Sequence, residues 1–313
     1  MLHLRAVCPP GRTDDVLAAL KAHEGTTHIV LLRGVAVEPP GDVVEADVAR
    51  EATDEVVASL CELGVDRDGG LTLEQIDTAL SDAADRAEEL APGDAADAVV
   101  WQELVARTGE ESRLNATFLS FLTIACLLAA VGVVTNSAIT IVGAMVVGPE
   151  FGPLAALAVG LVRRRRDLVR QAALALGAGF PIAMVITGLV VLLFAATGLI
   201  ERSTALAGHD VDFVFQVGPF SLIVALLAGA AGMLSMTSAK SAALVGVFIS
   251  VTTVPAAGYA VVAAILGEWD RCGLSLLQLV INLIGIVIAS ALVLAVRSRR
   301  RPVPAAGRPL SKG

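Results

Sequence analysis

The order of apolar and polar positions divides the chain into two halves. Up to about residue 80, short segments that alternate between apolar and polar residues are interleaved with segments of helical spacing. From about residue 115, apolar runs of twenty or more residues dominate. Alternation is typical of half-buried strands, and long apolar runs are typical of membrane helices. The pattern predicts a small α+β domain followed by an α-helical membrane domain.

Six elements are predicted in the first half. LHLRAVCP alternates like a strand, and TDDVLAALKAH begins with a capping threonine and continues with helical spacing. Two further strands, a second helix and a short last strand follow, at 27–39, 42–51, 53–64 and 69–77. This βαββαβ order predicts a cytoplasmic ferredoxin-like domain over residues 1–80.

Residues 81–114 form an acidic, alanine-rich segment that Pro92-Gly93 interrupts. We predict two helices here, the second over 95–111. Trp101 is expected near the lipid headgroups, since tryptophan is enriched at membrane interfaces. The segment is interpreted as a helical connector lying against the membrane, with a solvated linker helix as the alternative.

The second half contains six segments long and apolar enough to cross a bilayer. They cover 116–135, 137–162, 171–198, 217–237, 241–266 and 274–296. The second is broken at its middle and the fifth at TTVP. We assign residues 115–297 to the transmembrane domain and residues 298–313 to a basic, disordered cytoplasmic tail.

The charges between these segments predict their orientation. Arginines cluster at 163–166 and 297–301, whereas the loops 199–216 and 267–273 are mainly acidic. Because positive charge is retained on the cytoplasmic side, both termini are expected in the cytoplasm, with the protein in the inner membrane. No signal-peptide pattern is found in the first 30 residues.

The six segments divide into two similar sets of three. Each set contains a glycine, a short Ser/Thr/Asn turn, Ser-Ala, Val-Gly and a proline near mid-membrane. Three spans per set would make the repeats inverted, and broken helices at equivalent places indicate a transporter binding site. Chance similarity between helices rich in Ala, Gly and Val is the alternative.

The break in the second span, GPEFGP, contains a carboxylate, Glu150. An ionisable group at membrane depth indicates a functional site by default. A re-entrant turn near the outer surface, with Glu150 hydrated, is the alternative. The candidate substrate-binding residues are Asn136, Ser137, Gly148, Pro149, Glu150, Gly152, Pro153, Thr252, Thr253, Pro255 and Asn282.

Composition limits the function classes. The chain is 55% hydrophobic and only 17% charged, which favours membrane insertion. The first 113 residues hold 9 Lys/Arg and 24 Asp/Glu, and the other 200 hold 14 and 7. The arginine run beside a span gives no reason to expect nucleic-acid binding. The four cysteines are far apart, and in the calcium-loop-like GVDRDGGLTLEQ two ligand positions are Gly64 and Gln75.

Because no catalytic motif is found either, we expect no enzyme, no metal and no cofactor. The polar loop around residue 66 is predicted to be a turn before the last strand.

Several motifs together resemble a family of prokaryotic membrane proteins, domain of unknown function 389. The matching stretches are AAVGVVTNSAITIVGAM, the Gly-Pro break, LLAGAAGMLSMTSAKSAALVGVFISVTTVP, and INLIGIVIAS with Asn282. The resemblance runs from about Ser112 to Val296 and implies the fold and topology, but no activity, substrate or cofactor. The family's break usually has an apolar residue where Glu150 stands, and a double proline where Pro255 is single. Glu150 is therefore not a group that the family shares.

The sequence favours a transporter or channel-like protein for a small solute or ion, with the cytoplasmic domain as a regulator. The alternative is a membrane-anchored ligand sensor or assembly scaffold without transport. A homo-oligomer, dimer or trimer, is expected because small residues permit close helix approach and the first domain offers edge strands. The small residues are Gly148, Gly152, Gly177, Gly229 and Gly232.

Overall fold

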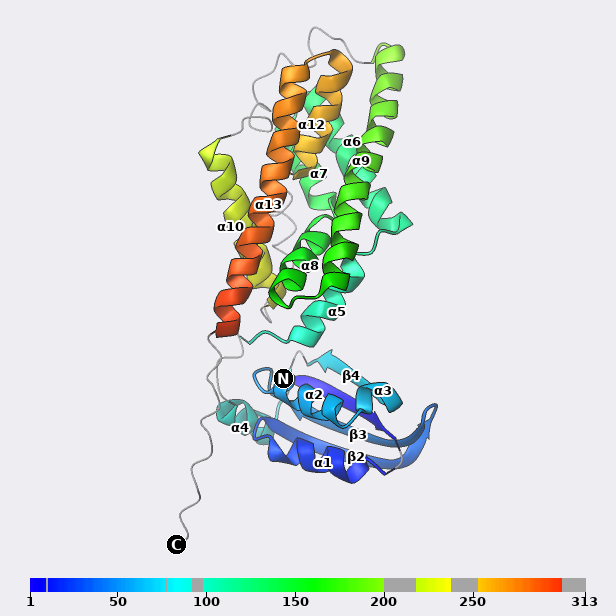
Figure 1. The fold of residues 1–313 in the computed structure, drawn as a ribbon, viewed down its shortest axis with the longest axis vertical. Coiled ribbons are helices and arrows are strands. Elements are labelled where there is room, and N and C mark those ends of the chain that lie inside the picture. Colours follow the sequence, from blue (N-terminus) through cyan, green and yellow to red (C-terminus); the bar gives the residue numbers. More distant parts are fainter. Residues whose placement is uncertain (10, 77, 92–97, 200–217, 238–252, 300–313) are drawn as a thin grey trace. The chain divides into compact units, whose positions relative to one another are not determined.

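The computed structural model describes residues 1–9, 11–76, 78–91, 98–199, 218–237 and 253–299 (Figure 1). The chain divides into two compact units. The first comprises Met1–Leu104, Thr237–Ala239 and Arg297–Gly313, and the second comprises Val105–Met236 and Lys240–Val296. Helix α5 (Trp101–Glu111) begins in the first unit and ends in the second.

The first unit is built on a four-stranded antiparallel sheet with the strand order β2-β3-β1-β4. The predicted sheet is therefore confirmed, and its strand order is that of a ferredoxin-like domain. Residues 65–68, expected to form a turn, form the short helix α3 instead. The elements are β1 (Leu2–Cys8), α1 (Thr13–Ala22), β2 (Thr26–Val37), β3 (Pro40–Val48), α2 (Thr53–Glu62), α3 (Val65–Asp68) and β4 (Gly70–Gln75).

The alternation of β1 and β3 explains the core of this unit. Every second residue of β1, from Leu2 to Cys8, is buried. In β3, every second residue from Val44 to Val48 is buried in the same way. These side chains pack in one cluster with residues of α1 and α2, among them Val16 and Leu20. The two helical positions are four apart and so share one face of α1. One face of the sheet is thus covered by the two helices.

The segment after the sheet is attached to the first unit by polar contacts. Arg50, only 6% exposed, donates from Nε to the carbonyl of Ala98 and pairs with Glu103 at 3.6 Å. Asp54 accepts the backbone N–H of Trp101 at 3.0 Å, at the start of α5. The Trp101 side chain is buried. Its expected position near the lipid headgroups stays a prediction. α4 (Asp82–Leu90) precedes this contact.

The second unit consists of apolar helices (Figure 1). Within the described residues, four are long and apolar enough to cross a membrane, and the pair α7 and α8 can be counted as a fifth, bent span. The helices are α6 (Ala116–Val134), α7 (Ala138–Val147), α8 (Phe151–Val162), α9 (Arg166–Ala196), α10 (Pro219–Thr237), α12 (Thr253–Leu266) and α13 (Trp269–Arg299).

The described residues support four or five spans, which is fewer than the six predicted. The difference falls on the segment 241–266, of which only α12, with 14 residues, is described. The prediction of six spans, and of two inverted sets of three, stays a prediction. The break predicted in the second segment lies between α7 and α8, an arrangement that fits a broken span or a re-entrant turn.

Glycines permit the closest helix contacts in this unit. A Cβ at Gly258 of α12 would lie 2.6 Å from the Cβ of Ala129 on α6. A Cβ at Gly229 of α10 would lie 2.5 Å from the carbonyl oxygen of Ile286 on α13. Real side chains do not approach so closely, so only glycine allows these pairs to pack at this distance. α6 also packs against α7 and α9.

Candidate functional site

The break between α7 and α8 consists of three residues, Gly148, Pro149 and Glu150. The two helices are bent by 52° at this point. Gly152 and Pro153, expected to be part of the break, lie in the first turn of α8. A proline is tolerated there because the first N–H groups of a helix have no acceptor within it. The break is therefore shorter than the GPEFGP motif predicts.

Glu150 is completely buried at this break. Its Oε1 accepts a hydrogen bond of 2.6 Å from the hydroxyl of Thr253. Its Oε2 has no hydrogen-bond partner among the described residues. Thr253 is also completely buried and is the first residue of α12, so the carboxylate connects the α7–α8 break to the start of α12.

Gly148 is required here by space rather than by backbone conformation. Its φ is −63°, which any residue adopts, but a Cβ would lie 2.3 Å from Glu150 Oε2 and 2.9 Å from a methyl group of Val254. The carboxylate thus occupies the place that a side chain at position 148 would need. Without a glycine at position 148, neither the Glu150 carboxylate nor Val254 of α12 could lie as close to this backbone.

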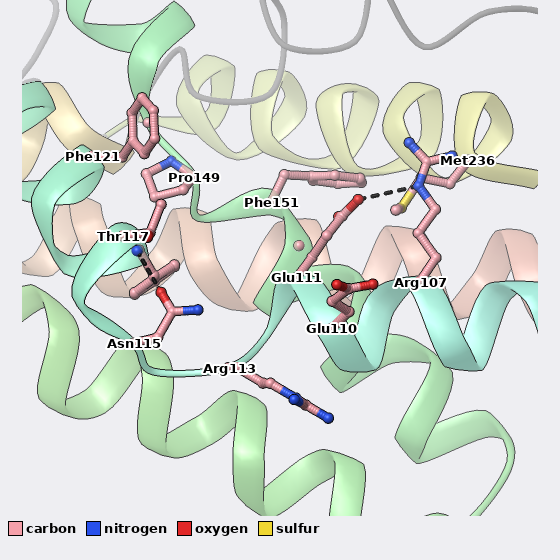
Figure 2. A pocket seen from close by; sticks show the side chains of 13 residues that line it. Arg107, Glu110, Glu111, Arg113, Asn115, Thr117, Phe121, Pro149, Phe151 and Met236 are labelled. Carbon is pink, nitrogen blue, oxygen red and sulfur yellow. Dashed lines mark hydrogen bonds and ion pairs between the residues drawn. The ribbon is translucent and has the colours of Figure 1, made fainter.

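A pocket of about 400 Å³ lies on another side of the same break (Figure 2). The residues on either side of Glu150 line it, namely Gly148 and Pro149 before it and Phe151 and Gly152 after it. Glu150 itself is not among the lining residues. The backbone of the break therefore separates the pocket from the buried carboxylate.

The pocket has an apolar wall and a charged rim. Phe118, Phe121, Phe151 and Met236 contribute apolar surface. The charged lining residues come from the end of α5 and the residues after it: Arg107, Glu110, Glu111 and Arg113. Figure 2 shows the ion pair between Arg107 and Glu111, at 3.1 Å. A lining that is mostly apolar with a few charged groups is typical of small-molecule sites.

Glu111 lies directly against the start of α8. A Cβ at Gly152 would be 2.6 Å from the Cβ of Glu111 and 3.1 Å from its Oε2. A carboxylate near a helix N-terminus is stabilised by the partial positive charge of that terminus. Gly152 therefore permits a contact between α5 and α8 that a larger residue would prevent.

The remaining predicted site residues lie elsewhere. Ser137 caps α7 at the end of the helix opposite to the break, accepting the N–H of Thr140 at 3.2 Å. Asn136 precedes it with a left-handed φ of 49°. Since α7 has ten residues, both are about 15 Å from Gly148 along the helix. Pro255 is buried in the first turn of α12. Thr252 lies outside the described residues.

Asn282 belongs to a separate polar cluster between α10 and α13. It is completely buried, and its Oδ1 accepts from the hydroxyl of Ser221 at 3.3 Å. The amide of Gln278 also donates to Ser221. Ser275 is buried one turn before Gln278. Asn282 is therefore hydrogen-bonded to α10, whereas Glu150 is hydrogen-bonded to the start of α12.

Ser221, Ser275 and Gln278 were not among the residues predicted from the sequence, although a signal was present. Positions 275, 278 and 282 are three and four residues apart, so they share one face of α13. Polar residues in that spacing within an apolar helix indicate a helix contact or a polar site. The charged rim of the pocket was missed because α5 was interpreted only as part of a connector.

The apolar helices of the second unit follow, along the chain, a small domain with an antiparallel sheet. This combination fits a helical membrane protein. Residues 145–288 match the family model described as "Domain of unknown function (DUF389)", which supports the resemblance of this segment to that family. Glu150 and Thr253 both lie in the matched segment. No curated protein and no solved structure matches the chain.

Proposed function

We propose that this protein is a transporter or channel-like protein for a small solute or ion. The observation that supports the proposal best is the contact between the α7–α8 break and the start of α12, at Glu150 and Thr253. Broken helices that meet inside a membrane domain are where transporters bind their substrates and coupling ions. The proposal assigns this role to the Glu150 region.

The environment of Glu150 supports a cation or a proton as one of the transported species. A carboxylate buried in a membrane domain is costly unless a cation, a proton or water compensates its charge. No Lys or Arg among the described residues pairs with Glu150. Oε2 is left for such a species, beside the one hydroxyl contact from Thr253.

In this proposal, the transported species reaches the Glu150 region through the pocket beside the break. Four of its lining residues flank Glu150, and its mouth carries acidic and basic side chains. A small shift of the Gly148-Pro149 segment would connect the pocket to the carboxylate. Segments with glycine and proline at a helix break are suited to such a shift, because they carry fewer helical hydrogen bonds.

The test is flux through proteoliposomes that contain the purified full-length protein. Proton and alkali-cation movement would be followed with dyes sensitive to pH and membrane potential, and small-solute movement by vesicle swelling. We expect flux in the wild type and a loss of at least about tenfold in Glu150→Gln, which keeps the shape but removes the charge. Glu268→Gln, an exposed carboxylate between α12 and α13 that does not line the pocket, is the matched control and should retain flux. Absence of flux for all probes would favour the sensor or scaffold alternative.

The proposal includes the remaining expectations from the sequence: an inner-membrane protein with both termini in the cytoplasm, regulated by the first unit, and a homo-oligomer. For assembly, Gly148, Gly152 and Gly229 already contact residues of their own chain. Gly177 has no atom within 4 Å of a Cβ built on it, so it leaves room for a helix of a second copy. Mass photometry in mild detergent would measure the oligomeric state.

A further inference from the structure

Asp47 lies at the centre of a line of hydrogen bonds in the first unit. Its Oδ1 is 2.8 Å from Nδ1 of His3, and its Oδ2 is 2.7 Å from Nδ1 of His28. Nε2 of His28 is 2.9 Å from the hydroxyl oxygen of Ser81. A serine, a histidine and an aspartate are thus linked in one line.

The chemistry of the carboxylate determines the direction of each bond. An ionised carboxylate only accepts hydrogen bonds, so both imidazoles donate to Asp47 from Nδ1. A neutral imidazole with its proton on Nδ1 has a bare Nε2, and Ser81 therefore donates its hydroxyl proton to His28. The Ser81 oxygen also accepts the N–H of Ala83 at 3.2 Å. This is the arrangement that activates a serine nucleophile.

Three adjacent strands and the start of one helix build this line. His3 and Asp47 are opposite each other in the pairing of β1 with β3. His28 lies in β2 at a register shift between residues 27 and 30, and has a left-handed φ of 48°. Such a backbone is uncommon outside glycine, and bulges redirect side chains. Ser81 caps α4 and is thereby held in place.

A second Ser–His contact in the same unit differs from that of Ser81 in the direction of its hydrogen bond. Nε2 of His23 is 3.2 Å from the hydroxyl oxygen of Ser59, but Ser59 donates its proton to the carbonyl of Glu55 at 2.9 Å. His23 must therefore act as the donor. No carboxylate of the described residues is hydrogen-bonded to His23. Ser59 is thus not activated.

We propose that Ser81 is a nucleophile that attacks acyl esters, with His28 as its base and Asp47 as the residue that positions the imidazole. The Ser81 oxygen bonds to the ester carbonyl carbon while its proton passes to Nε2 of His28. The bond to the alcohol oxygen then breaks, and His28 gives the proton to the leaving alcohol. Water, deprotonated by His28, attacks the acyl-serine, the carboxylic acid is released, and Ser81 regains its proton.

The surroundings of Ser81 favour a small ester without negative charge. The first turn of α4 has N–H groups without a partner inside the helix, which stabilise the oxyanion. The same turn carries Asp82 and Asp85, which repel anionic substrates. Leu80 is 95% exposed beside Ser81 and offers apolar contact. The His28 side chain is 39% exposed, so a substrate in solution reaches it.

No pattern in the sequence predicts this site, and the expectation from the sequence was that the protein is not an enzyme. His28 is 19 residues from Asp47 and 53 residues from Ser81, and no motif connects them. The inference is independent of transport, because all four residues lie in the first unit.

The test is covalent labelling of the purified full-length protein with a fluorophosphonate probe, which reacts with activated serines. Intact-mass and peptide mass spectrometry would locate and count the adducts. We expect one adduct per chain, on Ser81, and hydrolysis of p-nitrophenyl acetate faster than that by Ser81→Asn. His28→Asn should lower the labelling rate by about a hundredfold, the smaller end of what a general base contributes.

The variants are chosen to keep the fold. Asparagine still caps a helix at position 81, and it tolerates the left-handed backbone at position 28. Asp47→Asn should lower the labelling rate, and Asp47→Glu, which keeps a carboxylate, should recover part of it. His23→Asn is the matched control and should leave labelling unchanged. Labelling of Ser59 as fast as that of Ser81, no labelling of Ser81, or no effect of His28→Asn would overturn the proposal.

Discussion

The hydroxyl of Thr253 donates a 2.6 Å hydrogen bond to Glu150, although 103 residues separate the two in the chain. Both side chains are completely buried. The bond joins the break between α7 and α8 to the first residue of α12.

Thr253→Val should destabilise the protein by about 1–3 kcal/mol, because the buried carboxylate loses its one side-chain donor among the described residues. Thr253→Ser, which retains a hydroxyl, is the control and should cost less. Unfolding in a denaturing detergent would measure both. In the Glu150→Leu background, Thr253→Val should cost markedly less, since the two changes remove the same interaction. Equal costs in both backgrounds would show that the bond contributes nothing.

Gly148→Ala should destabilise the break by about 1–3 kcal/mol, because the new Cβ meets Glu150 Oε2 at 2.3 Å and Val254 at 2.9 Å. Gly143→Ala, five residues earlier and within α7, is the matched control, since no atom lies within 4 Å of a Cβ there. Alanine in a helix interior is favoured over glycine, so this control should be neutral or stabilising. Thermal unfolding in detergent distinguishes the two, and equal melting temperatures would contradict the packing at Gly148.

Asp54→Ala should loosen the start of α5, because Asp54 accepts the N–H of Trp101 at 3.0 Å. Loss of a capping side chain costs about 0.5–2 kcal/mol. Amide hydrogen exchange at residues 101–104 should become faster. Asp54→Asn, which still offers an oxygen, should retain most of the protection. Unchanged exchange in Asp54→Ala would show that the cap is not needed.

The first unit should lose stability in acid, because the ionised carboxylate of Asp42 stabilises it at neutral pH. The N–H of Gly34 and the hydroxyl of Thr13 donate to its carboxylate and hold its pKa below the ordinary value. A group whose pKa is lowered by folding stabilises the fold above its unfolded pKa, about 3.9 for aspartate. That contribution is lost as the pH falls toward the folded pKa. Asp42→Asn should therefore show a flatter dependence of stability on pH below about 4 than the wild type. Parallel curves for the two proteins would contradict this.

Single cysteines in a cysteine-free variant would test the predicted topology. Arginine clusters at 163–166 and 297–301 predict a cytoplasmic location for both positions. An impermeant thiol reagent added to intact cells should label cysteines placed at 203–212 and should not label one at position 164. Strong labelling at 164 from outside would contradict the predicted orientation.

Local patterns in the sequence determine the elements of this protein. Alternation in LHLRAVC corresponds to β1, because successive side chains of a strand point to opposite faces and one face is covered by α1 and α2. The break between α7 and α8 is found where glycine and proline interrupt the apolar run, since proline lacks the N–H that a helix needs. These effects act between neighbouring residues, so they can be read from the order of residues.

The partners of the polar side chains were decided only by tertiary structure. Glu150 and Asn282 were expected in one site, but Glu150 contacts Thr253, whereas Asn282 contacts Ser221 on α10. Helix rotation and the close approach that glycine permits determine such contacts, and both depend on packing between segments far apart in the chain.

The line from Ser81 through His28 to Asp47 has the same origin. Pairing of β1, β2 and β3 aligns His3, His28 and Asp47, and His28, at a register shift in β2, is hydrogen-bonded to Ser81 at the start of α4. The sequence determines the local positions of these residues: Ser81 caps α4, His28 lies in β2 and Asp47 lies in β3. Their hydrogen bonds exist only because strand pairing, which is non-local, brings the three segments within reach of one another.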